Sequence, residues 1–416
     1  MALMRVVAIC AVAVLAAGCL GNDAEGDLAA PSGEANGSPG ASTIGGATTS
    51  GTAAPTASIT PRPTLRPIPL GDGPFRSPQK RMTGEVLAFV NYGDLNTVLP
   101  MLEYETLSTI AYFSVSLLRS GRLDKRGPAW AGWTGSTMDK LIERAHRKGT
   151  RVVLTAERFA WSSAGATEAR ALLGSATARR TAAREIAAAV DERGVDGVNI
   201  DFEPIPSGQS ENFVTFVRLV RKALDAKRRG YQLTYSATGH IANYDVASLA
   251  RKGAADAVYI MGYQYRGAWS KEAGSVAPLG GPGYDVTDTV DEYLERTTAG
   301  KVILGAPLYG WSWLTTGPGL HARTRGGSAA VFYRDAVKMA GRTKPGYDKV
   351  EQVAWISYRS GSNWRQLYYD DARGIRAKFS LVKQRQLAGV GLWALGFEGS
   401  EGPAIFDLLR DSFVQK

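Results

Sequence analysis

Residues 196–204 read Asp-Gly-Val-Asn-Ile-Asp-Phe-Glu-Pro, a regular alternation of polar and apolar side chains. A period of two predicts a β-strand with Asn199, Asp201 and Glu203 on one face and apolar side chains on the other. Carboxyl groups aligned on a buried strand repel each other and lose hydration, so a fold gains nothing by placing them there without a use. Because this pair ends at Pro204, at the kind of strand end where α/β enzymes gather catalytic groups, we interpret it as catalytic. The alternative is a half-exposed edge strand with a solvated acidic face.

Apolar runs and helix-like segments alternate on both sides of this motif. The runs that predict strands cover residues 86–91, 107–115, 151–156, 195–201, 231–237, 257–261, 302–306 and 390–394. Helices are expected over residues 136–149, 167–193, 210–229, 285–298 and 371–387, the first opened by a capping box at Ser136-Thr137-Met138-Asp139. Eight strands, each followed by a helix, predict an α/β fold of the (β/α)8 barrel type, because right-handed crossovers leave few other closed topologies. A doubly wound open sheet is the alternative architecture.

One connection in this pattern is too long for a barrel loop. Some sixty residues rich in aromatic side chains separate the strand that ends near Pro307 from the helix that begins at Asp371. We expect a small α+β insertion over residues 311–368, which walls the top of the barrel. Its aromatic residues either stack on sugar rings or form the core of the insertion, and each is interpreted as core until a sugar contact is demonstrated.

The N-terminal residues carry the features of an export signal. Arg5 precedes an apolar run over residues 6–15, which is too short to cross a bilayer core, so we predict a signal peptide over residues 1–19. Leu15-Ala16-Ala17-Gly18-Cys19 resembles the lipobox of bacterial lipoproteins, in which Cys19 would become the lipidated first residue. An ordinary cleaved signal is the alternative. The protein is therefore expected to be exported, either as a cell-surface lipoprotein or in secreted form.

A segment of low complexity follows the signal. Residues 20–82 are mostly Gly, Ala, Ser, Thr and Pro, which predicts a flexible linker before a catalytic barrel over residues 83–416. Both cysteines, Cys10 and Cys19, fall within the signal, so no disulfide is expected in the folded part.

The formal net charge is +10 and the isoelectric point is near 9.5, with the basic residues spread along the chain. Such a surface helps an exported protein stay near anionic wall polymers or lipids, although a merely solvated surface is the simpler interpretation. The export signal and the carboxylate site argue against nucleic acid. We expect membrane contact through the lipid anchor only, and a monomer.

The histidines give no sign of a metal site. His146, His240 and His321 are isolated and show no ligand spacing; His146 is expected on a helix surface and His321 in a loop, and only His240 could line the cleft. The sequence also lacks a phosphate-binding glycine loop and a dinucleotide fingerprint. No cofactor is therefore expected.

The motif over residues 196–204 resembles the D-G-x-D-x-D-x-E signature of glycoside hydrolase family 18, the chitinases and their relatives, whose (β/α)8 barrel carries it at strand four. By count it is also strand four here. Met261-Gly262-Tyr263-Gln264 resembles the family's M-x-Y-D at strand six, and residues 305–310 and 391–396 resemble its segments at strands seven and eight. The last of these, with Tyr369-Asp370-Asp371 before it, is most similar to the bacterial spore-germination and cortex-lytic branch.

This resemblance implies a glycosidase that cleaves β-1,4-linked N-acetylglucosamine polymers, either chitin or peptidoglycan, by substrate-assisted retaining catalysis. Glu203 would be the general acid and later the base. Asp201 would hold the acetamido N–H, and Tyr263 would donate a hydrogen bond to the acetamido oxygen. Trp393 would form the floor beneath the reacting ring. A barrel lectin that binds the same sugars without cutting them is the alternative, although family lectins typically lose the acid that Glu203 supplies.

Four further residues complete the expected substrate-binding set: Asn199, Gln264, Tyr309 and Phe89. Two of them depart from the family pattern, because Asn199 and Gln264 stand where it has Asp.

The strand-three motif S-x-G-G is also replaced, by Thr155-Ala156-Glu157-Arg158. We expect Glu157 and Arg158 to pair with each other or to face solvent. The three departures together bear on substrate range and rate more than on reaction type.

Overall fold

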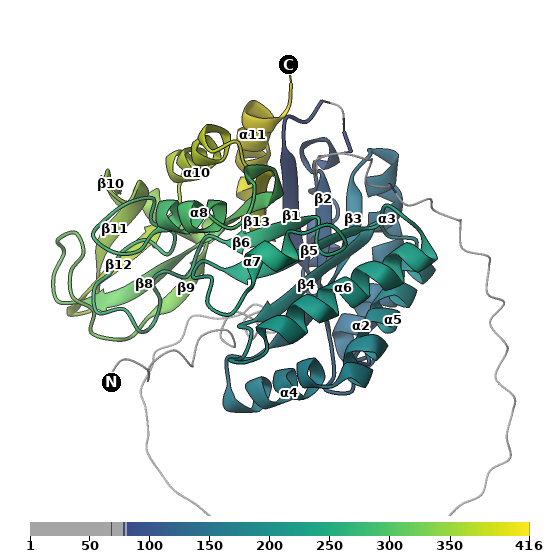
Figure 1. Cartoon of the computed structure of the whole chain (residues 1–416). Helices are drawn as coiled ribbons and strands as arrows, with labels where there is room; N and C mark the ends of the chain where they lie inside the picture. Colours follow the sequence, from purple (N-terminus) through teal and green to yellow (C-terminus); the bar gives the residue numbers. More distant parts are fainter. Residues whose placement is uncertain (1–67, 69–77, 80, 416) are drawn as a thin grey trace, which may run out of the picture.

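An eight-stranded parallel barrel forms the main body of the computed structural model, which describes residues 68, 78–79 and 81–415 (Figure 1). The strands close in the order β1-β13-β7-β6-β5-β4-β3-β2. They are β1 (Glu85–Asn91), β2 (Thr109–Ser116), β3 (Arg151–Phe159), β4 (Gly197–Glu203), β5 (Gln232–Thr238), β6 (Ala257–Met261), β7 (Val302–Pro307) and β13 (Gly389–Leu395). Because the first and last of these strands pair with each other, the barrel prediction is confirmed and the open doubly wound sheet is wrong.

Helices connect the strands and lie around the outside of the barrel (Figure 1). The α-helices are α1 (Leu95–Val98), α2 (Gly127–Thr134), α3 (Ser136–Arg147), α4 (Ser163–Gly174), α5 (Ala176–Arg193), α6 (Ser210–Lys227), α7 (Val246–Leu249), α8 (Val286–Leu294), α10 (Ala372–Gln384) and α11 (Gly402–Phe413). Short 3-10 turns cover Tyr104–Thr106, Ala299–Lys301 and Gly399–Glu401. The α-helices that follow β1 and β5, α1 and α7, are only one turn long. These two helices are therefore shorter than the full helix that was predicted after each strand.

Two predicted helix details differ from the structure. The helix expected over residues 167–193 is divided into α4 and α5, because Ser175 is extended between them and its hydroxyl accepts a hydrogen bond from the Ala178 N–H at 3.2 Å. The prediction of a capping box at Ser136 is wrong. Gly135 both ends α2 and caps α3, so Ser136 is already the first helical residue and its side chain does not occupy the capping position.

The chain between β7 and α10 forms the expected α+β insertion. It contains a five-stranded antiparallel sheet in the order β10-β11-β12-β8-β9, drawn on the left of Figure 1. Its elements are β8 (Tyr309–Thr315), β9 (Ala329–Phe332), α9 (Tyr333–Ala340), β10 (Gly346–Asp348), β11 (Val353–Ser360) and β12 (Asn363–Tyr369). A small core of its own, built around Ile356 and Leu367, lies between the sheet and α9.

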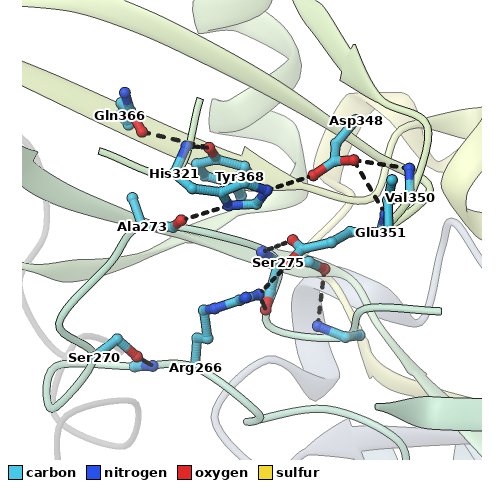
Figure 2. A network of polar contacts seen from close by, with 12 residues as sticks. Arg266, Ser270, Ala273, Ser275, His321, Asp348, Val350, Glu351, Gln366 and Tyr368 are labelled. Atoms are coloured by element: carbon cyan, nitrogen blue, oxygen red, sulfur yellow. Dashed lines mark hydrogen bonds and ion pairs between the residues drawn. The ribbon is translucent and has the colours of Figure 1, made fainter. Parts of the chain in front are cut away.

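A polar network joins this insertion to the loop that follows β6 (Figure 2). Nη1 of Arg266, in that loop, lies 2.5 Å from Oε1 of Glu351. Nε2 of His321 lies 2.8 Å from Oδ2 of Asp348, and the other ring nitrogen lies 3.0 Å from the Ala273 carbonyl oxygen. The network holds the insertion against the barrel loop at one edge of the mouth.

The same network contains a set of possible metal ligands. His321, Asp348 and Glu351 each bring a ligand atom within 4.8 Å of the others. His321 does lie in a loop, but the expectation that it is isolated is wrong, because the fold places two carboxylates beside it that spacing along the chain does not show. Arg266 already neutralises Glu351, so we interpret the group as an ion-pair network.

His146 also has a partner that its place on a helix did not predict. Its Nε2 lies 2.8 Å from Oδ2 of the fully buried Asp196, and the same oxygen accepts the Val152 N–H at 2.6 Å. Asp196 opens the acidic motif at the N-terminal end of β4, the end opposite to Glu203. The first carboxylate of the motif is therefore structural.

The two ends of the described chain meet at the N-terminal end of the barrel. Met82 forms an antiparallel bridge with Val414, and the Thr83 N–H donates to the Phe413 carbonyl at 2.8 Å. Gln79 is buried and its amide donates to backbone carbonyls of the barrel, so packing begins slightly inside the predicted linker.

The predicted signal peptide, Cys19 and most of the linker lie outside the described residues. In the part of the chain that the structure describes, no helix combines the length and apolar character needed to span a membrane.

Candidate active site

Strand β4 carries the acidic motif into the barrel. Every residue of β4 is buried, so the alternative of a solvated edge strand is wrong. Asp201 is 3% exposed and Glu203, the last residue of the strand, is 9% exposed. Because side chains alternate along a strand, Asn199, Asp201 and Glu203 form an inward-facing row that ends at the C-terminal mouth.

Asp201 and Glu203, two residues apart on the same face of β4, affect each other's pKa. Burial raises the pKa of Asp201 to about 7, although the neighbouring side chains of Glu203 and Ser236 act in the opposite direction. Burial and the neighbouring Asp201 charge hold the pKa of Glu203 well above its usual range. Two like charges this close cannot both ionise freely, so Glu203 retains a proton that it can give to a substrate.

Tyrosine hydroxyls lie beside this pair. Tyr263, just after β6, is buried and its hydroxyl lies 3.4 Å from that of Tyr259. Burial keeps the pKa of Tyr263 well above its usual range, so the phenol remains a hydrogen-bond donor at neutral pH. Tyr309, which follows β7, packs edge-on against Tyr263 with ring centroids 6.2 Å apart. The structure thus brings Tyr263 and Tyr309 together at the mouth.

An aromatic floor lies at the end of β13, across the barrel from β4. Trp393 of β13 is partly exposed and packs edge-on against Phe113 at 4.6 Å and against Phe89 at 5.5 Å between ring centroids. Phe89 itself is 1% exposed. We therefore correct the expectation that Phe89 binds substrate: its ring is covered by Trp393 and supports that indole from below.

Asn199, another predicted binding residue, also lies differently from the expectation. The amide of Asn199 is fully buried; its Nδ2 donates to Oγ1 of Thr234 at 2.9 Å, and its Oδ1 accepts the Ser236 hydroxyl at 2.9 Å. Asn199 therefore serves the barrel interior and does not reach a sugar. Gln264 is exposed at the start of the loop after β6, where its φ is 66°, and its contact with substrate stays a prediction.

Glu157 is the main site residue that the sequence interpretation missed. It is only 6% exposed, lies in register with Asp201 on the neighbouring strand, and accepts a hydrogen bond from the Ser116 hydroxyl. Arg158 instead donates to the Leu117 carbonyl at 3.0 Å, so the expectation that the two residues pair or face solvent is wrong for Glu157. Extending the predicted strand beyond Ala156 would have revealed its inward position, because β3 continues to Phe159.

Two aromatic residues near Glu203 were also missed. The Tyr244 hydroxyl donates to the Phe202 carbonyl at 2.6 Å and so supports the backbone between the two carboxyl groups. The indole N–H of Trp161, in the loop after β3, partly offsets the rise in the pKa of Glu203. Neither residue stands in a motif, and only the folded loops place them here.

A parallel barrel with a proton-sharing carboxyl pair, tyrosine hydroxyls and an aromatic floor at its C-terminal mouth has the acid–base site of a glycoside hydrolase. Comparison with known proteins gives the family. The sequence profile described as Glycosyl hydrolases family 18 matches residues 160–398, more than half of the chain. The chain therefore belongs to glycosyl hydrolase family 18, as its motifs predicted.

Curated relatives include both cortex-lytic and chitinolytic proteins. A cortical fragment-lytic enzyme of Bacillus subtilis is 29% identical over 259 residues, which cover 59% of this chain and 56% of that protein. Chitinase 1 of Aphanocladium album is 28% identical over 282 residues, which cover 62% of this chain and 64% of that protein. The chain thus spans between about half and two thirds of the length of the curated relatives that it matches.

Solved structures show the same fold. A family 18 chitinase from Cycas revoluta in complex with (GlcNAc)3 matches with a TM-score of 0.70 at 18% identity, over 79% of this chain and 99% of that one. The spore cortex-lytic enzyme SleL of Bacillus megaterium matches with a TM-score of 0.63 at 20% identity, over 86% of this chain and 77% of that one.

Proposed function

We propose that this protein hydrolyses β-1,4-linked N-acetylglucosamine polymers, chitin or peptidoglycan, by substrate-assisted retaining catalysis. The observation that carries the proposal is the coupled pair at the end of β4, in which Asp201 helps Glu203 keep its proton at the barrel mouth. The relatives support it, because they include a cortical fragment-lytic enzyme and a chitinase. In this arrangement Glu203, which a lectin does not need, has a buried partner and a raised pKa.

In the first step Glu203 donates its proton to the glycosidic oxygen, and the bond from that oxygen to the anomeric carbon breaks. The carbonyl oxygen of the substrate's own 2-acetamido group attacks that carbon from the opposite face. Asp201 accepts a hydrogen bond from the acetamido N–H and stabilises the positive charge that develops on the group. The Tyr263 hydroxyl donates to the acetamido oxygen, and the partly exposed Trp393 supports the sugar ring.

In the second step the Glu203 carboxylate takes a proton from water, and the resulting nucleophile opens the cyclic intermediate at the anomeric carbon. Two displacements on the same carbon leave the β configuration unchanged. Glu203 ends with its proton restored, ready for another cycle.

We also propose that the protein acts outside the cytoplasm, as a monomer tethered through a lipid on Cys19 or released after cleavage of an ordinary signal. The lipobox-like sequence before Cys19 supports the tethered form. A basic surface would keep either form near anionic wall polymers.

The role of the acetamido group can be tested with matched oligosaccharides. We expect cleavage of chito-oligosaccharides and no cleavage of cello-oligosaccharides of the same length, because glucose lacks the internal nucleophile. Early-time proton NMR should show new reducing ends in the β configuration. Purified peptidoglycan assayed in parallel, with product masses, would identify the preferred polymer. Initial release of the α anomer would contradict the double displacement.

A further inference from the structure

The barrel interior holds a third carboxyl group, which the mechanism above does not use. Glu157 of β3 pairs in register with Asp201 of β4. Residues paired across parallel strands point to the same face, and neighbouring strands lie only about 4.8 Å apart. Glu157 and Asp201, both almost fully buried, therefore lie side by side in the barrel interior.

Position 199 is electrically neutral in the same region. The Asn199 amide is held by Thr234 and Ser236, and it contributes no carboxyl group where the family signature has one. Asp201, two residues further along β4, has one buried oxygen, Oδ1, that lacks a hydrogen-bond partner among the described residues. This oxygen of Asp201 is thus available to accept a hydrogen bond from a proton donor.

We propose that Glu157 is a positioning residue that supplies, from β3, the second inner carboxyl group that position 199 lacks, and that it shares a proton with Asp201 in the free protein. This inference rests on the proposed function, because the shared proton matters only if Asp201 acts on a substrate. The Ser116 hydroxyl, from β2, donates to Glu157 and fixes the orientation of its carboxyl group. A carboxyl group at position 157 of β3, in place of one at position 199 of β4, still lies beside Asp201.

The charged and titratable groups around the pair determine how it responds to pH. Glu203 adjoins Asp201 on β4, and Tyr244 and Tyr259 approach from the side of β5 and β6. Arg158, the neighbour of Glu157 on β3, lowers the pKa of Glu157, but burial outweighs it and the net shift is upward.

The effect of Glu157 on the catalytic pair has a definite sign. A negative Glu157 disfavours ionisation of its neighbours, so it raises the pKa of both Asp201 and Glu203. Activity requires ionised Asp201, which sets the acid limb of the pH profile, and protonated Glu203, which sets the alkaline limb. Removing the Glu157 charge lowers both pKa values, so both limbs should move to lower pH.

The decisive experiment compares Glu157→Gln with the double variant Glu157→Gln/Asn199→Asp on a chito-oligosaccharide. We expect the single variant to move both limbs by about one pH unit toward acid, and to lower kcat on the alkaline limb more than it changes KM. The double variant should return the profile toward wild type, because the hydroxyls of Thr234 and Ser236 can both donate to a carboxylate at position 199. Glu143→Gln, on the exposed side of α3, is the matched control and should leave the profile unchanged.

Two outcomes would overturn the inference: an unchanged pH profile in Glu157→Gln, or a shifted profile that Asn199→Asp does not restore. If Glu157→Gln folds poorly, Asn199→Asp alone tests the same coupling in reverse and should move both limbs to higher pH.

A carboxyl-carbon NMR titration gives a readout that does not depend on turnover. The Asp201 resonance should titrate at lower pH in Glu157→Gln than in wild type, and an identical midpoint would refute the shared proton. Wild type that cleaves no chito-oligosaccharide would refute the proposed function, whereas this titration would still decide the role of Glu157.

Discussion

Glu203→Gln is expected to lower the turnover of chito-oligosaccharides by a factor on the order of 10³, while sugar binding survives. Glutamine keeps the size of the side chain and can still form hydrogen bonds, but it has no proton of suitable acidity for the leaving oxygen. Steady-state kinetics gives the loss in kcat, and calorimetric titration of an N-acetylglucosamine oligomer gives the binding constant. Both measurements are needed, because a misfolded variant would lose binding as well.

Glu398→Gln is the matched control for this substitution. Glu398 is another buried glutamate whose pKa burial raises to about 7, but its carboxylate accepts the Gly396 N–H at 2.8 Å and lies outside the proposed machinery. The Glu398→Gln variant should retain most of the wild-type turnover. If Glu203→Gln turned over at a near-normal rate, Glu203 would not be the acid.

Asp201→Asn should cause the second-largest loss, on the order of 10² in kcat, because the acetamido group loses the charge that stabilises it as it becomes positive. The pH profile should change as well. The Asp201 charge raises the pKa of Glu203, so without it Glu203 loses its proton at lower pH and the alkaline limb moves toward acid. A pH series of kcat measures the size of the loss and the direction of the shift together.

Asp411→Asn, on the exposed face of α11, removes the same charge from the surface and should alter neither quantity. A loss of kcat in Asp201→Asn with an unmoved alkaline limb would show that Asp201 does not control the protonation of Glu203.

Much of this molecule could be predicted from its residues. Short apolar runs placed all eight barrel strands, and a gap of some sixty residues revealed the insertion, because both signals are local properties of the sequence. The inward row that ends with Asp201 and Glu203 followed from the period-two alternation of residues 196–204.

The contents of the site beyond that row depend on tertiary contacts. Glu157 was missed because the predicted strand ends at Ala156, three residues before β3 ends at Phe159. The charged pair Glu157-Arg158 also has the local character of a solvated strand end. Asn199 and Phe89 were assigned to the substrate because alternation gives the face of a strand and not the depth of a side chain in the barrel. The depth of a side chain in the barrel depends on the stagger of the neighbouring strands. That stagger is set by pairing between strands that are far apart in the sequence.

The meeting of Met82 and Val414 beneath the barrel has a practical consequence for handling the protein. Both ends of the folded part leave from the face opposite to Glu203, separated from it by the length of a strand, about 20 Å. A bead, a lipid vesicle or a fusion partner attached at either end would therefore sit behind the molecule. An insoluble polysaccharide could then approach the mouth from the front, so immobilised preparations should work on particles as well as on short soluble oligomers.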